Sequence, residues 1–352
     1  MAIENLDVNE TLEKARRLLK EDETGKRYVA RFPDGVTKAI QYGSGVKSES
    51  VYLSMFQLVP LARVQGHFSD QMGLPLSKGS VSNFNEDAYE RLDQFEAWAK
   101  QQLLIWPLNH ADETGINVNG TKIWLHNLSN EKVTLYHPDK KRGKEAMDRM
   151  GVLPHYSGWL CHDHWKPYYK YSKIIHCLCN AHHIRELERV IEEDGHQWAK
   201  TLLQFLVDLN HAVDAASGAL SDEAICETTK RYREILEQGG TECPKPPPKE
   251  SGRRGRVKKT FSRNLLERLR DFEADTLRFM TEAIVPFTNN QGENDLRMTK
   301  VQQKISGCFR SMEGAKIFCR VRSFLSTCRK NDVSPASALR DLFQGKLPAF
   351  MS

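Results

Sequence analysis

The stretch LLIWPLNHADETGINV (103–118) decides the fold, together with TKIWLHNLS (121–129) and KVTLYHP (132–138), which follow it directly. Each is a short run rich in apolar and β-branched residues and bounded by turn residues, a pattern that predicts a strand. Three such runs in succession favour an antiparallel meander.

Two further runs, SGWLCHDHW (157–165) and SKIIHCLC (172–179), predict a fourth and a fifth strand. A short helix over Gly143–Met150 and a brief helical stretch after Trp165 separate the strands, so the predicted order is β-β-β-α-β-α-β. We therefore expect an α/β fold built on a mixed five-stranded sheet.

A mainly helical region is expected before the sheet. Residues 48–72 are amphipathic with an interruption at Pro60, and a break at Gly73-Leu74-Pro75 precedes Ser77, which can cap a helix over Val81–Leu103. Helix, short turn and helix is the outline of a helix-turn-helix DNA-binding element. An ordinary helical hairpin is the alternative.

Changes in composition and hydrophobic pattern along the chain predict five segments. They are a polar segment 1–47, the helical region 48–103, the first part of the core 104–182, a helical insertion 183–287 and the last part of the core 288–352. In the first segment we expect a helix near Glu10–Glu21 and short extended pieces around Tyr28–Ile40. In the insertion, a Pro/Gly/basic linker at 241–260 includes Arg253, Arg254 and Arg256, which can contact phosphates.

Positive charge collects late in the chain. The net charge is +5, yet two acids, Asp295 and Glu313, oppose nine basic residues between positions 294 and 330. The nine are Arg297, Lys300, Lys304, Arg310, Lys316, Arg320, Arg322, Arg329 and Lys330. This excess favours a polyanionic partner, and a solvated helix face is the alternative.

Composition also argues against several classes of protein. The sequence contains no apolar run long enough for a transmembrane helix, and its start lacks the apolar core of a secretory signal. We therefore expect the eight cysteines to be reduced thiols. None lies in a CxxC pair, which argues against a zinc ribbon.

Three acids lie where a cleft can form. Asp112 is expected at the end of the first strand of the sheet, Asp163 at the end of the fourth, and Glu293 at the start of a late helix. Such carboxylates can hold two hard cations, Mg²⁺ or Mn²⁺, for phosphoryl displacement. The alternatives are that each Asp only caps a turn and that Glu293 pairs with Arg297. Spacing alone does not unite the three.

The helix that begins near Glu293 carries a row of basic residues. Arg297, Lys300 and Lys304 fall on nearly the same face as Glu293, Gly307 is expected to end the helix, and Arg310 follows in a loop. Such a row suits the phosphates that flank a cleavage point in DNA. A solubilising stripe is the alternative.

Four motifs resemble the insertion sequence 66 family of DDE transposases. They are HADETG (110–115), SGWLCHDHWKPYY (157–169), CLCNAHHIREL (177–187) and VPFTNNQGENDLRMTKVQQKISGCFRS (285–311). They occur in the family's order, and the resemblance runs from about Phe32 to Phe350. The last motif is the most specific of the four.

This resemblance implies a ribonuclease-H-like core with a helical insertion before the Glu293 helix. It implies that Asp112, Asp163 and Glu293 are the catalytic triad and hold two Mg²⁺ (or Mn²⁺) ions. The Cys179-Asn180-Ala181-His182 sequence resembles the C/D-x-x-H element of related transposases, which implies that His182 lies near the scissile phosphate. Zinc binding by the Cys/His cluster and a plain helix-capping role remain open.

The implied function is DNA transposition: metal-dependent cleavage at the 3′ ends of an insertion sequence, then strand transfer by direct attack on a target phosphodiester. The implied partners are double-stranded DNA, further copies of the chain on paired ends, and accessory proteins of the element, in the cytoplasm at a bacterial nucleoid. Alternatives are a nuclease or resolvase that cuts without joining, a zinc-dependent hydrolase, and a catalytically inactive DNA-binding relative. The last is suggested by the lack of any cysteine before Cys161, because family members carry a Cys-rich N-terminal element.

Overall fold

A computed structural model describes residues 20–21, 27–28, 41–246 and 257–351. The chain forms two compact units, Met1–Val46 and Lys47–Ser352. In the first, strand β1 (Lys20–Glu21) pairs antiparallel with β2 (Arg27–Tyr28). The helix expected near Glu10–Glu21 is therefore wrong at its last two residues, which form a strand, and the rest of it lies outside the described residues. Of the extended pieces expected around Tyr28–Ile40, Tyr28 lies in β2, and residues 29–40 lie outside the described residues.

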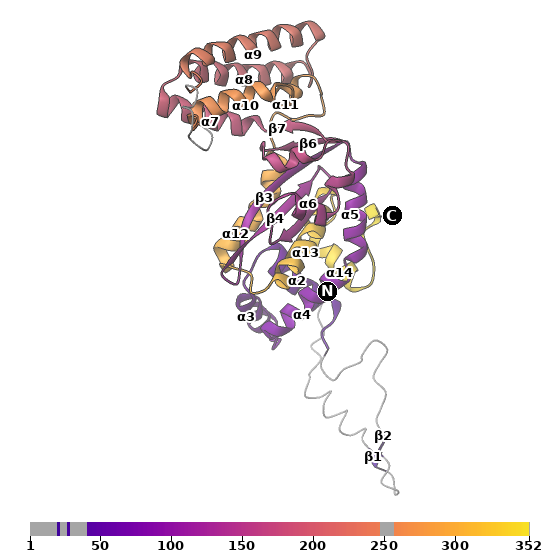
Figure 1. Ribbon diagram of the computed structural model, residues 1–352. Coiled ribbons are helices and arrows are strands. Elements are labelled where there is room, and N and C mark those ends of the chain that lie inside the picture. Colours follow the sequence, from indigo (N-terminus) through magenta and orange to yellow (C-terminus); the bar gives the residue numbers. More distant parts are fainter. Residues whose placement is uncertain (1–19, 22–26, 29–40, 247–256, 352) are drawn as a thin grey trace. The chain divides into compact units, whose positions relative to one another are not determined.

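The second unit is built on the predicted five-stranded sheet (Figure 1). Its strands are β3 (Leu108–Val118), β4 (Thr121–Ser129), β5 (Thr134–Asp139), β6 (Trp159–His162) and β7 (Ile175–Leu178). The order is β5-β4-β3-β6-β7, with β3, β4 and β5 in an antiparallel meander and β6 and β7 parallel to β3. The mixed sheet expected from the apolar runs is confirmed.

The connections that follow β5 and β6 are short and largely as expected. Helix α6 (Lys144–Met150) ends at Gly151, whose φ of 83° is the left-handed conformation that glycine adopts most readily. The brief helical stretch expected after Trp165 is the 3₁₀ turn η3 (Lys166–Lys170), and the short 3₁₀ turn η2 (Leu153–His155) precedes β6. These connections place β6 beside β3 and β7 beside β6, with all three strands parallel.

Among the described residues, five helical elements precede the sheet: α2 (Ser44–Val51), the π-helical turn η1 (Tyr52–Phe56), α3 (Leu61–Met72), α4 (Lys78–Glu90) and α5 (Asp93–Ile105). The breaks at Pro60 and Gly73 and the Ser77 cap, whose hydroxyl accepts from the Ser80 amide, are confirmed. The single helix expected over Val81–Leu103 is wrong. The chain turns at Arg91 and Leu92, where the fully buried Leu92 side chain is drawn into the core.

The helical insertion follows β7 as a bundle (Figure 1), and its apolar core continues into the sheet through Leu108, Cys161 and Cys177. Its elements are α7 (Asn180–Asp194), α8 (Gln197–Ala215), α9 (Asp222–Glu242), α10 (Phe261–Asp271), α11 (Glu273–Leu277) and the 3₁₀ turn η4 (Arg278–Met280). Contacts run from α7 to α8, α9, α10 and back to α7, so the four long helices form a closed ring around Trp198, Tyr232 and Leu266. The last helical element of the insertion, η4, ends at Met280.

The chain then returns to the sheet as α12 (Asn290–Ser306), which packs against β3 and β4, and α13 (Met312–Lys330), which packs along β5. Helix α14 (Pro335–Phe343) and the turn η5 (Ala349–Met351) complete the chain. No helix in the described part of the chain is long and apolar enough to cross a membrane.

Three basic side chains of α13 bind groups within the protein and so stabilise the fold. The guanidinium of Arg320 binds Asp93 and Glu96 of α5, while that of the buried Arg322 donates to the carbonyl oxygen of Phe56 at 2.6 Å. Lys330 pairs with Asp295 at 2.8 Å. These three of the nine late basic residues therefore bind acidic side chains and carbonyl groups within the protein.

Candidate active-site cleft

The parallel pairing of β3 with β6 brings two of the candidate carboxylates to the same level of the sheet. His110 lies opposite Cys161 in this register, and Asp112 and Asp163 each follow two residues later. Asp163 directly follows the end of β6, as expected. Asp112 does not end its strand, because β3 continues to Val118 through its antiparallel pairing with β4. The pairing of β3 with β6, however, ends at His110, so Asp112 lies two residues beyond it.

The loop at Asp163 has a defined shape. His164 adopts a φ of 58°, a left-handed conformation that is uncommon outside glycine, and its ring packs on Phe272 of the insertion. The next amide, that of Trp165, donates a hydrogen bond of 3.0 Å to Asp163 Oδ1. This turn holds the Asp163 carboxylate at the strand end.

Glu293 lies in the first turn of α12, as expected, and Asn289 fixes the start of this helix. The Asn289 side chain bonds to His110 Nδ1 at 2.8 Å and donates to the carbonyl oxygen of Ala111 at 2.9 Å. Its backbone amide donates to Cys179 Sγ at 3.1 Å. Asn289 therefore joins the helix start to β3, beside Asp112, and to the end of β7.

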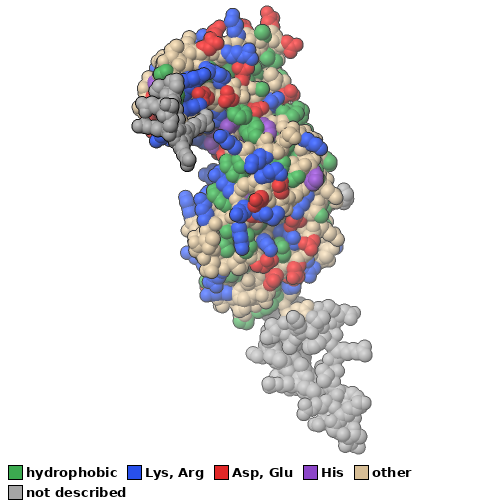
Figure 2. Space-filling view, in the orientation of Figure 1, with side chains coloured by type: hydrophobic (Ala, Val, Ile, Leu, Met, Phe, Trp, Pro, Cys, Tyr) green, Lys and Arg blue, Asp and Glu red, His purple; other side chains and the backbone are tan. Residues whose placement is uncertain are grey.

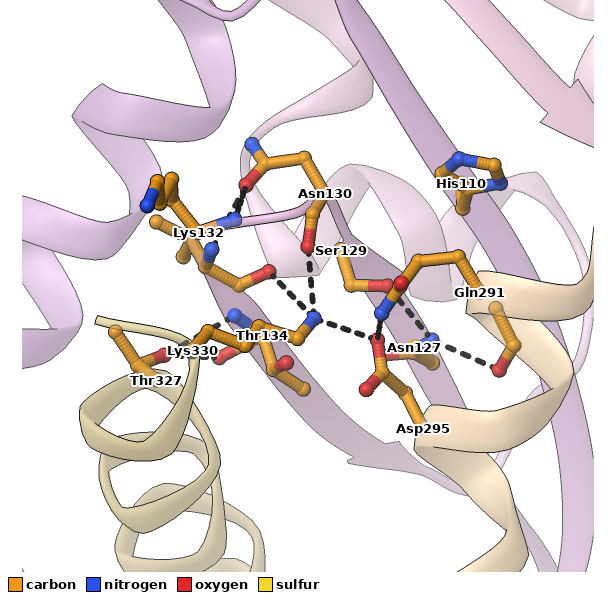
Figure 3. A network of polar contacts seen from close by, with 12 residues as sticks. His110, Asn127, Ser129, Asn130, Lys132, Thr134, Gln291, Asp295, Thr327 and Lys330 are labelled. Atoms are coloured by element: carbon orange, nitrogen blue, oxygen red, sulfur yellow. Dashed lines mark hydrogen bonds and ion pairs between the residues drawn. The ribbon is translucent and has the colours of Figure 1, made fainter. Parts of the chain in front are cut away.

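A second set of contacts anchors α12 at Asp295, two residues after Glu293 (Figure 3). The Asp295 carboxylate accepts from Lys330 Nζ at 2.8 Å and from Gln291 Nε2 at 3.0 Å. Lys330 also donates to the carbonyl oxygen of Asn130, and Tyr136 donates to the carbonyl oxygen of Asp295. Asp295 thus holds α12 against the sheet and α13, and its carboxylate is engaged there.

The three candidate carboxylates border two adjoining cavities. A cleft of about 540 Å³ is lined by Asp112, His182, Arg185, Glu293, Arg297 and Lys300, among others. Asp163 lines a neighbouring cavity of about 220 Å³ together with Cys179, His182, His183 and Arg268. His182 borders both cavities.

The DNA-binding candidates are distributed around this cleft. Arg297 and Lys300 line it, and Lys304 and Arg310 are exposed further along, on α12 and in the loop after it. Gly307 ends α12, as expected, and the Phe309 amide and carbonyl group pair with the end of β3. Figure 2 shows Lys and Arg side chains along the edge of the core where α12 lies. Arg253, Arg254 and Arg256 lie outside the described residues.

Electrostatics in the cleft favour a bound cation. Burial, then the charge of Glu113, and further those of Asp163 and Glu293, raise the pKa of Asp112 to about 7. Burial and Glu113 raise the pKa of Asp163 to about 6. Glu113 itself is held by Arg142 at 2.7 Å and by Tyr168 at 2.7 Å. Hard oxygen donors that repel one another in this way fit Mg²⁺ or Mn²⁺.

The raised pKa of Asp112 predicts how the stability of the metal-free protein depends on pH. The ionised carboxylate destabilises the fold, so the free energy of unfolding should fall as pH rises from about 4 to the folded-state pKa of about 7. Asp112→Asn should make this fall smaller, leaving the part that comes from Asp163, and stabilise the chelator-treated protein at about pH 8 by on the order of 2–4 kcal/mol. Thermal melting at about pH 5 and pH 8 measures the effect. The exposed Asp341→Asn is the control, and equal pH profiles for wild type and Asp112→Asn would contradict the prediction.

Sequence reasoning missed several residues of the site. Arg185 lies one helical turn after His182, and its Nη2 approaches Glu293 Oε1 to 3.5 Å. Burial and the charge of Arg185 lower the pKa of His182, whose Nδ1 lies 3.6 Å from the same oxygen. Arg185 could have been predicted from the sequence, because a residue three positions after His182 lies on the same face of a helix. Nothing local in the sequence indicated the long-range contacts of Asn289.

Residues 39–317 match a family model described as "Transposase IS66 family", and this range includes the candidate carboxylates and α12. No curated protein matches the chain.

Proposed function

Because this chain belongs to the IS66 family of transposases, we propose that it cuts the 3′ ends of a DNA element and joins them to target DNA. The observation that supports the proposal is that partly buried carboxylates, Asp112 and Glu293 in one cleft and Asp163 in the cavity beside it, lie next to a basic helix. Element ends and target, both double-stranded DNA, are the proposed substrates. Because two ends are joined in one event, we expect more than one copy of the chain to act together.

In this proposal Asp112, Asp163 and Glu293 hold two Mg²⁺ or Mn²⁺ ions. When bound, such ions activate the attacking oxygen and stabilise the leaving oxygen of an in-line phosphoryl transfer. Asp112 is fixed by a central strand, Asp163 by the turn at His164, and Glu293 by the anchored start of α12. Because water and a 3′-hydroxyl group are the attacking groups, no protein nucleophile is required.

The basic residues of α12 have a positioning role in the proposal. Arg297 and Lys300 line the cleft and Lys304 continues their row along the helix. Phosphates bound there would orient the scissile bond toward the carboxylates without reading its sequence. His182, which borders both cavities, would lie close to the same phosphate.

Replacing the three residues Arg297, Lys300 and Lys304 by alanine should weaken DNA binding and flatten its salt dependence. If each contacts one phosphate, the slope of log affinity against log salt should become less steep by about 2.7. Fluorescence anisotropy of a labelled duplex over a salt series measures this slope. A matched control removes three exposed cations of the bundle, Lys200, Lys230 and Arg231. An unchanged slope in the α12 variant would show that these three residues do not contact DNA phosphates.

A strand-transfer assay tests the proposed function directly. The protein is incubated with Mg²⁺, a plasmid target and duplexes that carry the element end, either intact or already cleaved at the 3′ end. We expect nicking of the intact end and joining of the cleaved end. Nicking without joining would assign a nuclease or resolvase activity instead. Binding with neither reaction would show a DNA-binding protein without catalysis.

A further inference from the structure

A second kind of metal site lies at the boundary of the two cavities. One ligand atom each from Cys179, His182 and Glu293 lies within 4.8 Å of the others. We propose that these three residues bind a thiophilic divalent ion, Zn²⁺ or Cd²⁺, in a site that shares Glu293 with the proposed magnesium site. Thiolate and imidazole ligands select such ions over Mg²⁺.

Local structure brings the three ligands together. Cys179 is the residue before α7 and His182 lies in its first turn, so their side chains share one face of the helix. The amide of Asn289 donates to Cys179 Sγ, and the amide of Asn180 donates to the carbonyl oxygen of Phe287. These bonds hold the start of α7 beside the start of α12, where Glu293 lies.

Two of the ligand atoms are buried and lack hydrogen bonds. His182 Nδ1 and Glu293 Oε1 have no hydrogen-bond partner among the described residues, although they lie 3.6 Å apart. Two ligands at bond lengths of about 2.0–2.1 Å around a tetrahedral ion are separated by about 3.4 Å. A bound ion would satisfy both atoms with little movement, and a small rotation would bring the Cys179 sulfur into range.

The site also has a fourth position and a path of entry. Asp163 lines the same small cavity as Cys179 and His182, so its carboxylate or a water molecule can complete four ligands. The side chains of His182 and Glu293 are 39% and 35% exposed, so an ion can reach them from the cleft.

The shared ligand has a functional consequence that rests on the proposed function. A thiophilic ion would engage Glu293 and His182, so the carboxylate could not complete the magnesium site at the same time. Low concentrations of Zn²⁺ or Cd²⁺ should therefore inhibit Mg²⁺-dependent cleavage, and excess Mg²⁺ should relieve the inhibition only in part, because it does not compete for the thiolate.

Binding is tested with Cd²⁺, whose bond to a thiolate gives an ultraviolet charge-transfer band. Cys226 and Cys308 are the exposed cysteines of the described chain, so Cys226→Ser/Cys308→Ser serves as the parent protein. We expect one saturating equivalent of Cd²⁺ in the parent and no band in Cys179→Ala. The matched control is Cys177→Ala, which removes another buried thiol two residues away and should retain the band. A band that persists in Cys179→Ala would overturn the proposal.

The other ligands are tested by affinity. His182→Ala and Glu293→Gln should each weaken Cd²⁺ binding by at least about tenfold, and unchanged affinity in both would overturn the ligand set. If Cys179→Ala does not fold, these two variants carry the test. Asp112→Asn lies outside the three-residue set and should bind Cd²⁺ like the parent. A protein that binds Cd²⁺ in this pattern but never cleaves DNA would refute the proposed function and leave this site standing.

Discussion

Asp112→Asn should lower Mg²⁺-dependent cleavage of an element end by at least about 10³-fold, the equivalent of about 4 kcal/mol of lost transition-state stabilisation. The reason is that the carboxylate lies on a central strand, two residues beyond the last pair of the β3–β6 register, and in the same cleft as Glu293. The amide keeps the size of the side chain but removes an anionic ligand. Duplex DNA binding should be retained, because the basic residues of α12 are unchanged. Single-turnover cleavage and fluorescence anisotropy measure the two effects.

Matched variants make this result specific to the site. Glu293→Gln should have an effect of similar size, whereas Glu313→Gln, an exposed residue on α13, should cleave like wild type. Cleavage by Asp112→Asn at the wild-type rate would remove Asp112 from the proposed triad. Loss of DNA binding together with cleavage would indicate a folding defect rather than lost chemistry.

Lys330→Met should destabilise the protein by about 3 kcal/mol, because it leaves the Asp295 carboxylate without its cation in a largely buried position. The Asp295 and Lys330 side chains are only 11% and 14% exposed, and the lysine also donates to the carbonyl oxygen of Asn130 (Figure 3). Chemical denaturation at neutral pH measures the free energy of unfolding.

The double variant Lys330→Met/Asp295→Asn separates the lost pair from the stranded charge. It should recover part of the stability, since no ionised group is left without a partner. Lys316→Met is the matched control, because Lys316 pairs with Glu313 at 3.3 Å on the surface and should change stability by less than about 1 kcal/mol. If the two lysine variants were equally mild, the Asp295–Lys330 pair would not anchor α12.

Local pattern was sufficient to predict the sheet. Its strands are short apolar runs separated by turn residues, whereas the pairing of β6 with β3 brings together strands that are not consecutive in the chain and was not part of this pattern. The end of β3 was not predictable in this way, because it depends on how far β4 continues to pair with it. The turn between α4 and α5 was missed for a related reason. Neither glycine nor proline occurs at Arg91 and Leu92, and the turn is set by burial of Leu92 in the assembled core.

The basic residues show a different limit of sequence reasoning. Arg297 and Arg320 are chemically identical, but one is exposed beside the cleft and the other pairs with acids more than 200 residues away. A count of charges cannot separate them, because the difference lies in long-range partners. The positions of Asp163 and Glu293 were predictable from their place after a strand and at the start of a helix, whereas the supporting role of Asn289 was not.

The contact between Cys179 Sγ and the Asn289 amide also bears on how such a protein can diversify. It joins two points 110 residues apart, at which the chain leaves the sheet for the bundle and returns from it. The two ends of the inserted segment are in contact, so a change in its length alters the entropy of loop closure only modestly. The number of residues between these two points can therefore change while the points themselves stay in place.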